Sequence, residues 1–200
     1  MYCIYLGKSI GTINPADGSV GLSQLSATGT KDATTFLRGD NSFAEAGGKF
    51  ESALLHVRDE KSSGTAGGSS TSGSWEIRTL NTVLTNEISG ASLATNKITL
   101  PAGTYFINGR SNSRSATQHK CKLYNVTDTS DTLIGSNQYS PAGSGVSTDS
   151  TINGRFTIAG TKDFELRQRN ASAQPTDGYG LTCSFSVVEV YADVQIWKVA

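Results

Sequence analysis

Hydrophobic and polar residues alternate with a period of two along most of the chain beyond residue 48, as in strands with one buried face. Clusters of Ser, Gly, Thr and Asn separate these stretches, and none shows the apolar spacing of an amphipathic helix. Eight strands are expected, at residues 51–58, 75–84, 97–108, 120–125, 132–135, 151–158, 164–169 and 180–198. Their number and spacing predict an all-β sandwich over residues 50–200.

The last stretch changes character along its length. In its first part Cys183 and Phe185 alternate with Ser184 and Ser186, which predicts one dry and one wet face. From residue 187 to residue 199 nearly every position is hydrophobic, apart from a few polar side chains. A strand that is apolar on both faces needs cover on both. We expect a neighbouring subunit to supply the second cover.

Residues 1–49 carry too few hydrophobic side chains to form a core of their own. Residues 1–13 predict one strand, which we expect to be the end of an upstream fibre domain or a shaft strand, so that the chain is a fragment. Residues 14–49 open with the turn signal Asn14-Pro15-Ala16-Asp17-Gly18 and predict an extended linker that is ordered by partner chains.

Composition narrows the class of protein further. The 17 basic and 17 acidic side chains balance, so no net charge draws the chain to nucleic acid or to a membrane surface. No apolar run approaches the ~18 residues of a membrane span, which argues against membrane insertion. The 26 Ser, 23 Thr and 22 Gly suit sheets and their turns.

Candidate chemistry is sparse. No Ser-hydrolase, zinc-protease or phosphate-loop motif occurs, so we expect no catalytic residues, no enzymatic activity and no cofactor. Three Cys without C-x-x-C spacing and two His, at 56 and 119, predict no metal site within one protomer, although a trimer could gather three copies of one His on its axis. The tripeptide Arg38-Gly39-Asp40 is interpreted as a turn rather than as an integrin ligand.

Two passages resemble known families. Residues 21–44, GLSQLSATGTKDATTFLRGDNSFA, are similar to a linker that recurs in bacteriophage tail-fibre and tail-tip proteins. The segments WEIRTLNT (75–82), ITLPAGTYFINGRS (98–111), KLYNVTDT (122–129) and VVEVYADVQIWK (187–198) resemble the homotrimeric jelly roll of the complement and tumour-necrosis-factor type. The collagen stalk or membrane stem of animal members is absent from this sequence.

The resemblance implies a jelly-roll sandwich head (TNF-like) preceded by an extended fibre segment. It also implies a homotrimer with apolar and aromatic side chains near the three-fold axis. Tyr105 and Phe106 have opposite parities, so one is expected in the protomer core and the other at the interface. The residues predicted for the trimer interface are Tyr105, Phe106, Tyr191, Ile196 and Trp197.

Strand parity locates the candidate binding site. If eight strands alternate up and down, loops 59–74, 109–119, 136–150 and 170–179 share the far tip, and they are longer than most of the basal loops. Long loops rich in Tyr, Asn, Arg, Ser and Gly are typical of adaptable recognition surfaces. The predicted receptor-binding residues are Arg110, Arg114, His119, Asn137, Tyr139, Arg169, Asn170, Asp177 and Tyr179.

These observations favour a non-enzymatic, trimeric receptor-binding head of a phage tail fibre that attaches the virion to a host-surface glycan or protein. The expected location is the virion tail, assembled in the host cytoplasm, with other tail proteins as partners of the N-terminal segment. Two alternatives stay open at this point. The chain could be a purely structural fibre and trimerisation protein, or a bacterial surface adhesin with the same jelly roll.

Overall fold

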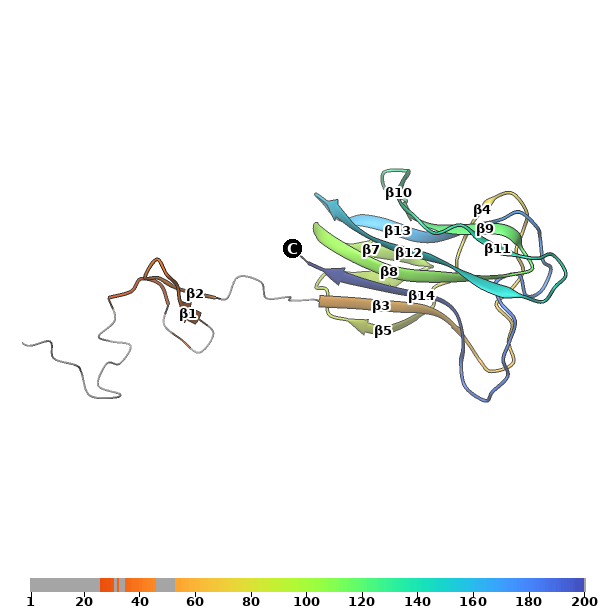
Figure 1. Cartoon of the computed structure of the whole chain (residues 1–200), viewed down its shortest axis with the longest axis horizontal. Helices are drawn as coiled ribbons and strands as arrows, with labels where there is room; N and C mark the ends of the chain where they lie inside the picture. Colours follow the sequence, from red (N-terminus) through yellow and green to blue (C-terminus); the bar gives the residue numbers. More distant parts are fainter. Residues whose placement is uncertain (1–25, 31, 33–34, 46–52, 200) are drawn as a thin grey trace, which may run out of the picture. The chain divides into compact units, whose positions relative to one another are not determined.

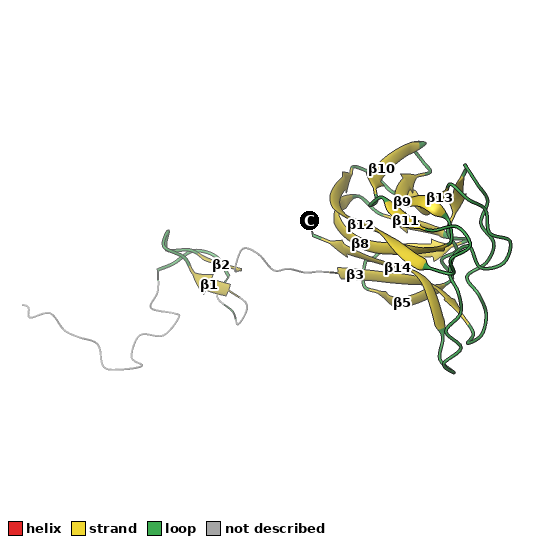
Figure 2. Cartoon of the chain, turned by 45° about the vertical axis from the view of Figure 1, so that its right-hand side comes forward, coloured by secondary structure: helices red, strands yellow, loops and turns green. Residues whose placement is uncertain are grey.

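The computed structural model describes residues 26–30, 32, 35–45 and 53–199. The chain forms two compact units, Met1–Lys49 and Phe50–Ala200. Every element in the described ranges is a β-strand (Figure 2), and these ranges contain no helix that could span a membrane. The strand predicted at residues 1–13 lies outside the described residues, as do the first two residues of the strand predicted at 51–58.

The described part of the first unit contains a β-hairpin within the predicted linker. Strand β1 (Thr35–Leu37) pairs antiparallel with β2 (Phe43–Glu45). In the connecting turn, the amide and hydroxyl of Ser42 both donate to Asp40 Oδ1, at 3.1 and 2.6 Å. The hydrogen bond from the Ser42 side chain is the main reason that the pKa of Asp40 is lowered. The Arg-Gly-Asp tripeptide therefore forms a hairpin turn.

The second unit, which we call the head, consists of two antiparallel sheets (Figure 1). The five-stranded sheet has the order β12 (Ser147–Ile158), β8 (Gly103–Arg114), β14 (Glu189–Lys198), β3 (Ala53–Lys61), β5 (Thr82–Asn86). The seven-stranded sheet has the order β10 (Ser130–Ile134), β9 (Thr117–Asn125), β13 (Lys162–Asn170), β7 (Lys97–Leu100), β6 (Ser92–Ala94). In addition, β11 (Gln138–Ser140) pairs with β9, and β4 (Trp75–Ile77) pairs with β13. The inner faces of the two sheets form one β-sandwich.

Antiparallel pairing gives the sandwich two ends. We call the end where β3 begins and β14 finishes the proximal end, and the end where β8 finishes and β9 begins the distal end (Figure 1). The register places the long loops 62–74, 141–146 and 171–188 at the distal end. The turns 126–129 and 159–161 lie at the proximal end.

Alternation along the strands builds the core. In β3, Leu55 and Val57 are fully buried between the sheets, while His56 and Arg58 face outwards. Near the proximal end the Tyr105 ring stacks on Phe156 with 5.5 Å between ring centroids, and its hydroxyl donates to the carbonyl oxygen of residue 101 at 2.6 Å. The proximal part of the core is therefore apolar, and the one Tyr hydroxyl that enters it is satisfied by the backbone.

Two strands expected from the sequence are each divided between the sheets. The 75–84 stretch yields β4, which pairs with β13, and β5, which pairs with β3. The 97–108 stretch yields β7 and β8, which also belong to opposite sheets, and Pro101 lies at the break. Proline cannot donate to a ladder, so the chain changes sheet there. Residues 78–81 make the other crossing, with Arg78 and Leu80 fully buried.

The last predicted strand is shorter than expected, because residues 180–188 form a loop at the distal end. Phe185 is 78% exposed and Val187 is 65% exposed, so the first part of this stretch has no dry face. The Glu189 carboxylate accepts hydrogen bonds from Thr182 Oγ1 and from the amides of residues 64, 183 and 184, which lower its pKa to about 2. Within β14, Asp193 and Gln195 keep most of the outer face polar. The expectation of a strand that is apolar on both faces is therefore wrong for β14.

Replacing Tyr105 with Ala is expected to lower the free energy of unfolding by about 3–5 kcal/mol, because it removes a fully buried ring from the core. Phe106, which is 41% exposed on the opposite face of β8, provides the matched control. Phe106→Ala should cost about 1 kcal/mol or less. Urea unfolding monitored by circular dichroism measures both values, and equal losses would contradict the assigned parity of β8.

Candidate functional site

A groove of about 660 Å³ lies at the distal half of the seven-stranded sheet, mainly on its outer face. We call it the distal groove. It combines an aromatic ring, two cations and several amide side chains. Its lining residues are Gly73, Trp75, Gln118, His119, Lys120, Asn137, Gln138, Arg169 and Ala171.

Strand register brings the groove residues together. Arg169 of β13 is directly opposite Trp75 of β4 on one side and Lys120 of β9 on the other. Directly opposed residues share a face, with Cβ atoms about 4.5–5.5 Å apart. Three strands that are distant in sequence thus present an aromatic, a guanidinium and an ammonium group as a row across the sheet.

Within the described part of the chain, three other cations on this sheet are paired, whereas the two cations of the groove are not, and neither is Lys97, which lies outside the groove. Lys122 pairs with Asp131 at 2.5 Å and Arg167 pairs with Glu165 at 2.7 Å. Lys120 and Arg169 make no side-chain hydrogen bond or ion pair with any described residue, and the groove lining contains no carboxylate. The groove therefore carries a local positive charge, although the net charge of the whole chain is zero.

Strand β4 is short and is held in place largely by side chains. Glu76 Oε2 accepts hydrogen bonds from the amide of Thr71 at 2.8 Å and from the hydroxyl of Tyr179 at 2.5 Å. The Nζ atom of Lys122 lies 4.3 Å from the centroid of the Trp75 ring. These contacts fix the strand that carries the aromatic residue of the groove.

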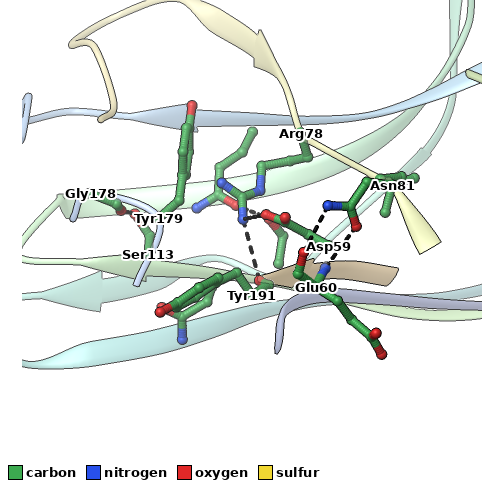
Figure 3. A network of polar contacts seen from close by, with 12 residues as sticks. Asp59, Glu60, Arg78, Asn81, Ser113, Gly178, Tyr179 and Tyr191 are labelled. Atoms are coloured by element: carbon green, nitrogen blue, oxygen red, sulfur yellow. Dashed lines mark hydrogen bonds and ion pairs between the residues drawn. The ribbon is translucent and has the colours of Figure 1, made fainter. Parts of the chain in front are cut away.

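Behind β4, the fully buried Arg78 enters the interior of the sandwich (Figure 3). Its Nη2 atom lies 3.6 Å from Asp59 Oδ2 and donates to the carbonyl oxygen of Tyr191 at 3.3 Å. Its guanidinium also lies 3.8 Å from the centroid of the Tyr179 ring. One side chain thereby connects β4 with β3, with β14 and with the distal loop that holds Tyr179.

Burial dominates the pKa values in this interior. It raises the pKa of Asp59, opposed by the charge of Arg78, and it raises the pKa of Tyr179, together with the hydrogen bond to Glu76. Burial also lowers the pKa of His119 to about 4. His119 is therefore neutral near pH 7, and its two ring nitrogens contact Thr148 Oγ1 at 2.8 Å and Gln168 Nε2 at 3.3 Å.

The residues predicted to bind a receptor divide into three groups. The distal groove is lined by His119, Asn137 and Arg169, although little of the His119 ring is exposed. Tyr139 is 56% exposed and lies on the neighbouring strand β11. Arg110 is paired with Asp149 at 3.1 Å on the outer face of the other sheet, and Arg114 is paired with Asp177. Asn170 and Tyr179 are buried, as is His119.

The predicted receptor-binding set did not include Trp75, Gln118, Lys120 and Gln138, although Gln118 and Gln138 lie in the predicted tip loops 109–119 and 136–150. The sequence assigned Trp75 to a continuous strand, and only the break after residue 77 transfers it to the sheet of Arg169. Lys120 was assigned to the predicted strand 120–125, and the candidate binding residues were sought in the loops. The useful signal was the parity of Lys120 and Arg169, which places both on the face opposite the core.

The five residues predicted for a trimer interface lie in different environments. Tyr105, Tyr191 and Ile196 are buried inside the protomer, where a neighbouring subunit cannot contact them. Strand parity points Tyr105 and Ile196 inwards. Tyr191 lies at the bulge of β14, and its hydroxyl donates to the carbonyl oxygen of Thr65. The burial of these three residues corrects that part of the prediction. Phe106 and Trp197 are on the outer face of the five-stranded sheet, with 6.1 Å between ring centroids.

No set of three or more His, Cys, Asp or Glu side chains in the described ranges is arranged to hold a metal ion. His56 is instead bonded to Asp193 at 2.9 Å, and Asp193 also accepts from Arg58 at 2.7 Å. Cys121 is buried and Cys183 is exposed, and both are free thiols.

Acid is expected to destabilise the head through His119. Because the folded-state pKa is about 4 and the unfolded value is 6.5, the unfolded chain takes up the proton first. This contribution to stability is complete above the unfolded pKa and is lost as the pH falls towards the folded pKa. Between about pH 7 and pH 4 the wild type should lose about 2–3 kcal/mol more than His119→Gln in urea unfolding. Parallel pH profiles for both proteins would refute this role of His119.

No protein-family model and no curated protein matches this sequence. Among solved structures, the globular domain of the zebrafish complement 1qA protein is similar, with a TM-score of 0.50 and 12% identity over 74% of this chain and 98% of that chain. Murine APRIL aligns with a TM-score of 0.47 and 8% identity over 74% of this chain and 99% of that chain. The head thus has the jelly-roll β-sandwich fold of the complement 1q globular domain.

Proposed function

We propose that this chain is a non-enzymatic receptor-binding head of a phage tail fibre, and that its distal groove binds a glycan or protein on the host surface. The observation that carries the proposal is the row of Trp75, Arg169 and Lys120 across three strands. Aromatic and Arg side chains supply rigid contact area, and the nearby amides supply adaptable hydrogen bonds. A groove of this size lies within the range of small-ligand sites.

The head acts as a homotrimer through the outer face of its five-stranded sheet. Support comes from a patch at the proximal end of that face, where Trp197 is directly opposite Leu54 on β3 and Phe106 on β8. Phe106 is exposed and the other two are partly exposed, and neighbouring apolar side chains of this kind favour a protein contact. Three copies of one groove on a single head would gain avidity from effective concentration, which suits a surface of repeated receptors.

The assignment to a phage tail rests on the linker resemblance of residues 21–44. In this proposal the N-terminal segment contacts other tail proteins, and the protein is assembled in the host cytoplasm and carried on the virion. A structural fibre protein and a bacterial adhesin are the competing outcomes. Inert groove variants would favour the structural fibre protein, and absence from purified virions would favour the adhesin.

The full-length chain is expected to be a trimer in light scattering at micromolar concentration. Phe106→Asp should shift it to monomers while leaving its circular dichroism spectrum unchanged, because a charge cannot be buried unpaired at a subunit contact. Ser92→Asp introduces the same charge at an exposed position of β6, in the seven-stranded sheet, and serves as the comparison. A monomeric wild type would remove the proposed trimer.

Trp75→Ala is expected to weaken attachment of the trimer to host cells by about tenfold per site, the range of a contributing contact in alanine scanning. Ile77→Ala is the matched control, because this 47% exposed residue lies two positions along the same strand outside the groove lining. Fluorescently labelled protein and flow cytometry measure attachment. Equal binding by both variants would place adhesion elsewhere in the fibre.

A further inference from the structure

The charge of the distal groove indicates what it binds. We infer that the groove takes an anionic saccharide, a sugar unit bearing a carboxylate or phosphate group, with the anion between Arg169 and Lys120 and the sugar ring against Trp75. This inference rests on the proposed receptor-binding function and names the ligand class for the same site. The neighbouring cations Arg169 and Lys120, which have no described acidic partner, are the feature on which this choice of ligand depends.

The groove cations differ from four paired cations on the outer faces of the two sheets. On the outer face of the five-stranded sheet, Arg58 is paired with Asp193 and Arg110 with Asp149. On the seven-stranded sheet, Lys122 and Arg167 are also paired. Arg169 and Lys120 are direct cross-strand neighbours without a described acidic partner. Two like charges side by side destabilise a sheet, and a bound anion would remove this cost.

The geometry suits a carboxylate or phosphate group. The guanidinium of Arg can donate two parallel hydrogen bonds to one anion, and the Lys ammonium adds a compact point charge. The opposite neighbour of Arg169 is Trp75, whose ring provides an apolar platform for the carbon-bound hydrogens of a sugar. Beyond Lys120, the amides of Gln118, Asn137 and Gln138 can bond ring hydroxyls.

Aromatic rings and cations also occur in sites for single-stranded nucleic acid. Two observations favour a saccharide. The chain has no net charge, whereas nucleic-acid binding depends on extended positive surfaces. The positive charge is confined to two residues, and the remaining polar lining is rich in amides. A sugar with one anionic group per repeat matches this distribution better than a continuous phosphate backbone.

The test is isothermal titration calorimetry of the full-length chain with three probes of equal length. They are tetragalacturonate, which carries carboxylates, maltotetraose phosphorylated at its hydroxymethyl groups, and neutral maltotetraose. We expect either anionic probe to bind at least about tenfold more tightly than maltotetraose, and the tighter of the two identifies the anion. Arg169→Gln and Lys120→Gln should each lower that affinity about tenfold, and Arg169→Lys should retain part of it.

Lys97→Gln is the charge-matched control, because Lys97 lies on the outer face of the same sheet but outside the groove. It should bind as the wild type does, and thermal unfolding checks that every variant is folded. Equal affinity for neutral and anionic probes, or wild-type affinity in both charge variants, would overturn the inference. So would tighter binding of a single-stranded oligonucleotide.

Host-cell attachment measured in parallel separates the two proposals. If Trp75→Ala abolishes attachment but the anionic probes neither bind nor compete, the ligand class is wrong and the receptor-binding function stands. If the probes bind in the groove but attachment is unchanged in Trp75→Ala, the saccharide site stands and the receptor-binding role of the groove is wrong.

Discussion

The buried guanidinium of Arg78 is the interaction on which the distal half of the head depends. It lies between Asp59 of one sheet and the strand β4 of the other, and it packs on the ring of Tyr179. A buried cation is tolerated only with partners that remain in place, because removing one leaves an uncompensated charge. Arg78 therefore ties the position of β4, and with it the groove, to the integrity of the sandwich.

The two ends of the sandwich have different roles. At the proximal end the interior is apolar, with Tyr105, Phe156 and Phe164 in ring contact, and it contributes the hydrophobic stabilisation. At the distal end the interior holds polar side chains such as Arg78 and His119. Hydrogen bonds have directional geometry, so a polar interior fixes the orientation of the strands that surround it. The groove lies over this end, where the orientation of side chains matters most.

Much of the fold followed from the sequence, because period-two alternation reports burial directly. The parities of Leu55 and Val57, of Tyr105 and Phe106, and of Lys120 and Arg169 could all be read in this way. The sheet crossing at residues 78–81 could not, because buried Arg78 and Leu80 alternate there with the more exposed Thr79 and Asn81, and this alternation looks like the continuation of a strand. The alternation of Phe185 with serines also predicted a strand. The hydrophobic pattern does not show that Glu189 accepts hydrogen bonds from the amides of residues 183 and 184 and so holds this segment as a loop.

The candidate site was harder to predict than the fold. Three of its residues were anticipated from loop length, but the row formed by Trp75, Arg169 and Lys120 depends on strand pairings between distant segments. Composition gave no sign of the site either, because a net charge of zero does not report that two cations without described acidic partners are neighbours in the fold. Once the pairing is known, the missing counter-charges identify the groove.

The central claim is that ligand binds in the distal groove, and the two tryptophans of the chain offer a direct measurement. Trp75 lines the groove, whereas Trp197 lies on the outer face of the other sheet. Fluorine NMR of the protein labelled with 5-fluorotryptophan gives one signal for each. A saturating concentration of whichever anionic probe binds more tightly should shift the Trp75 signal and leave that of Trp197 in place. A shift of the Trp197 signal alone, or of neither signal, would contradict this account of the site.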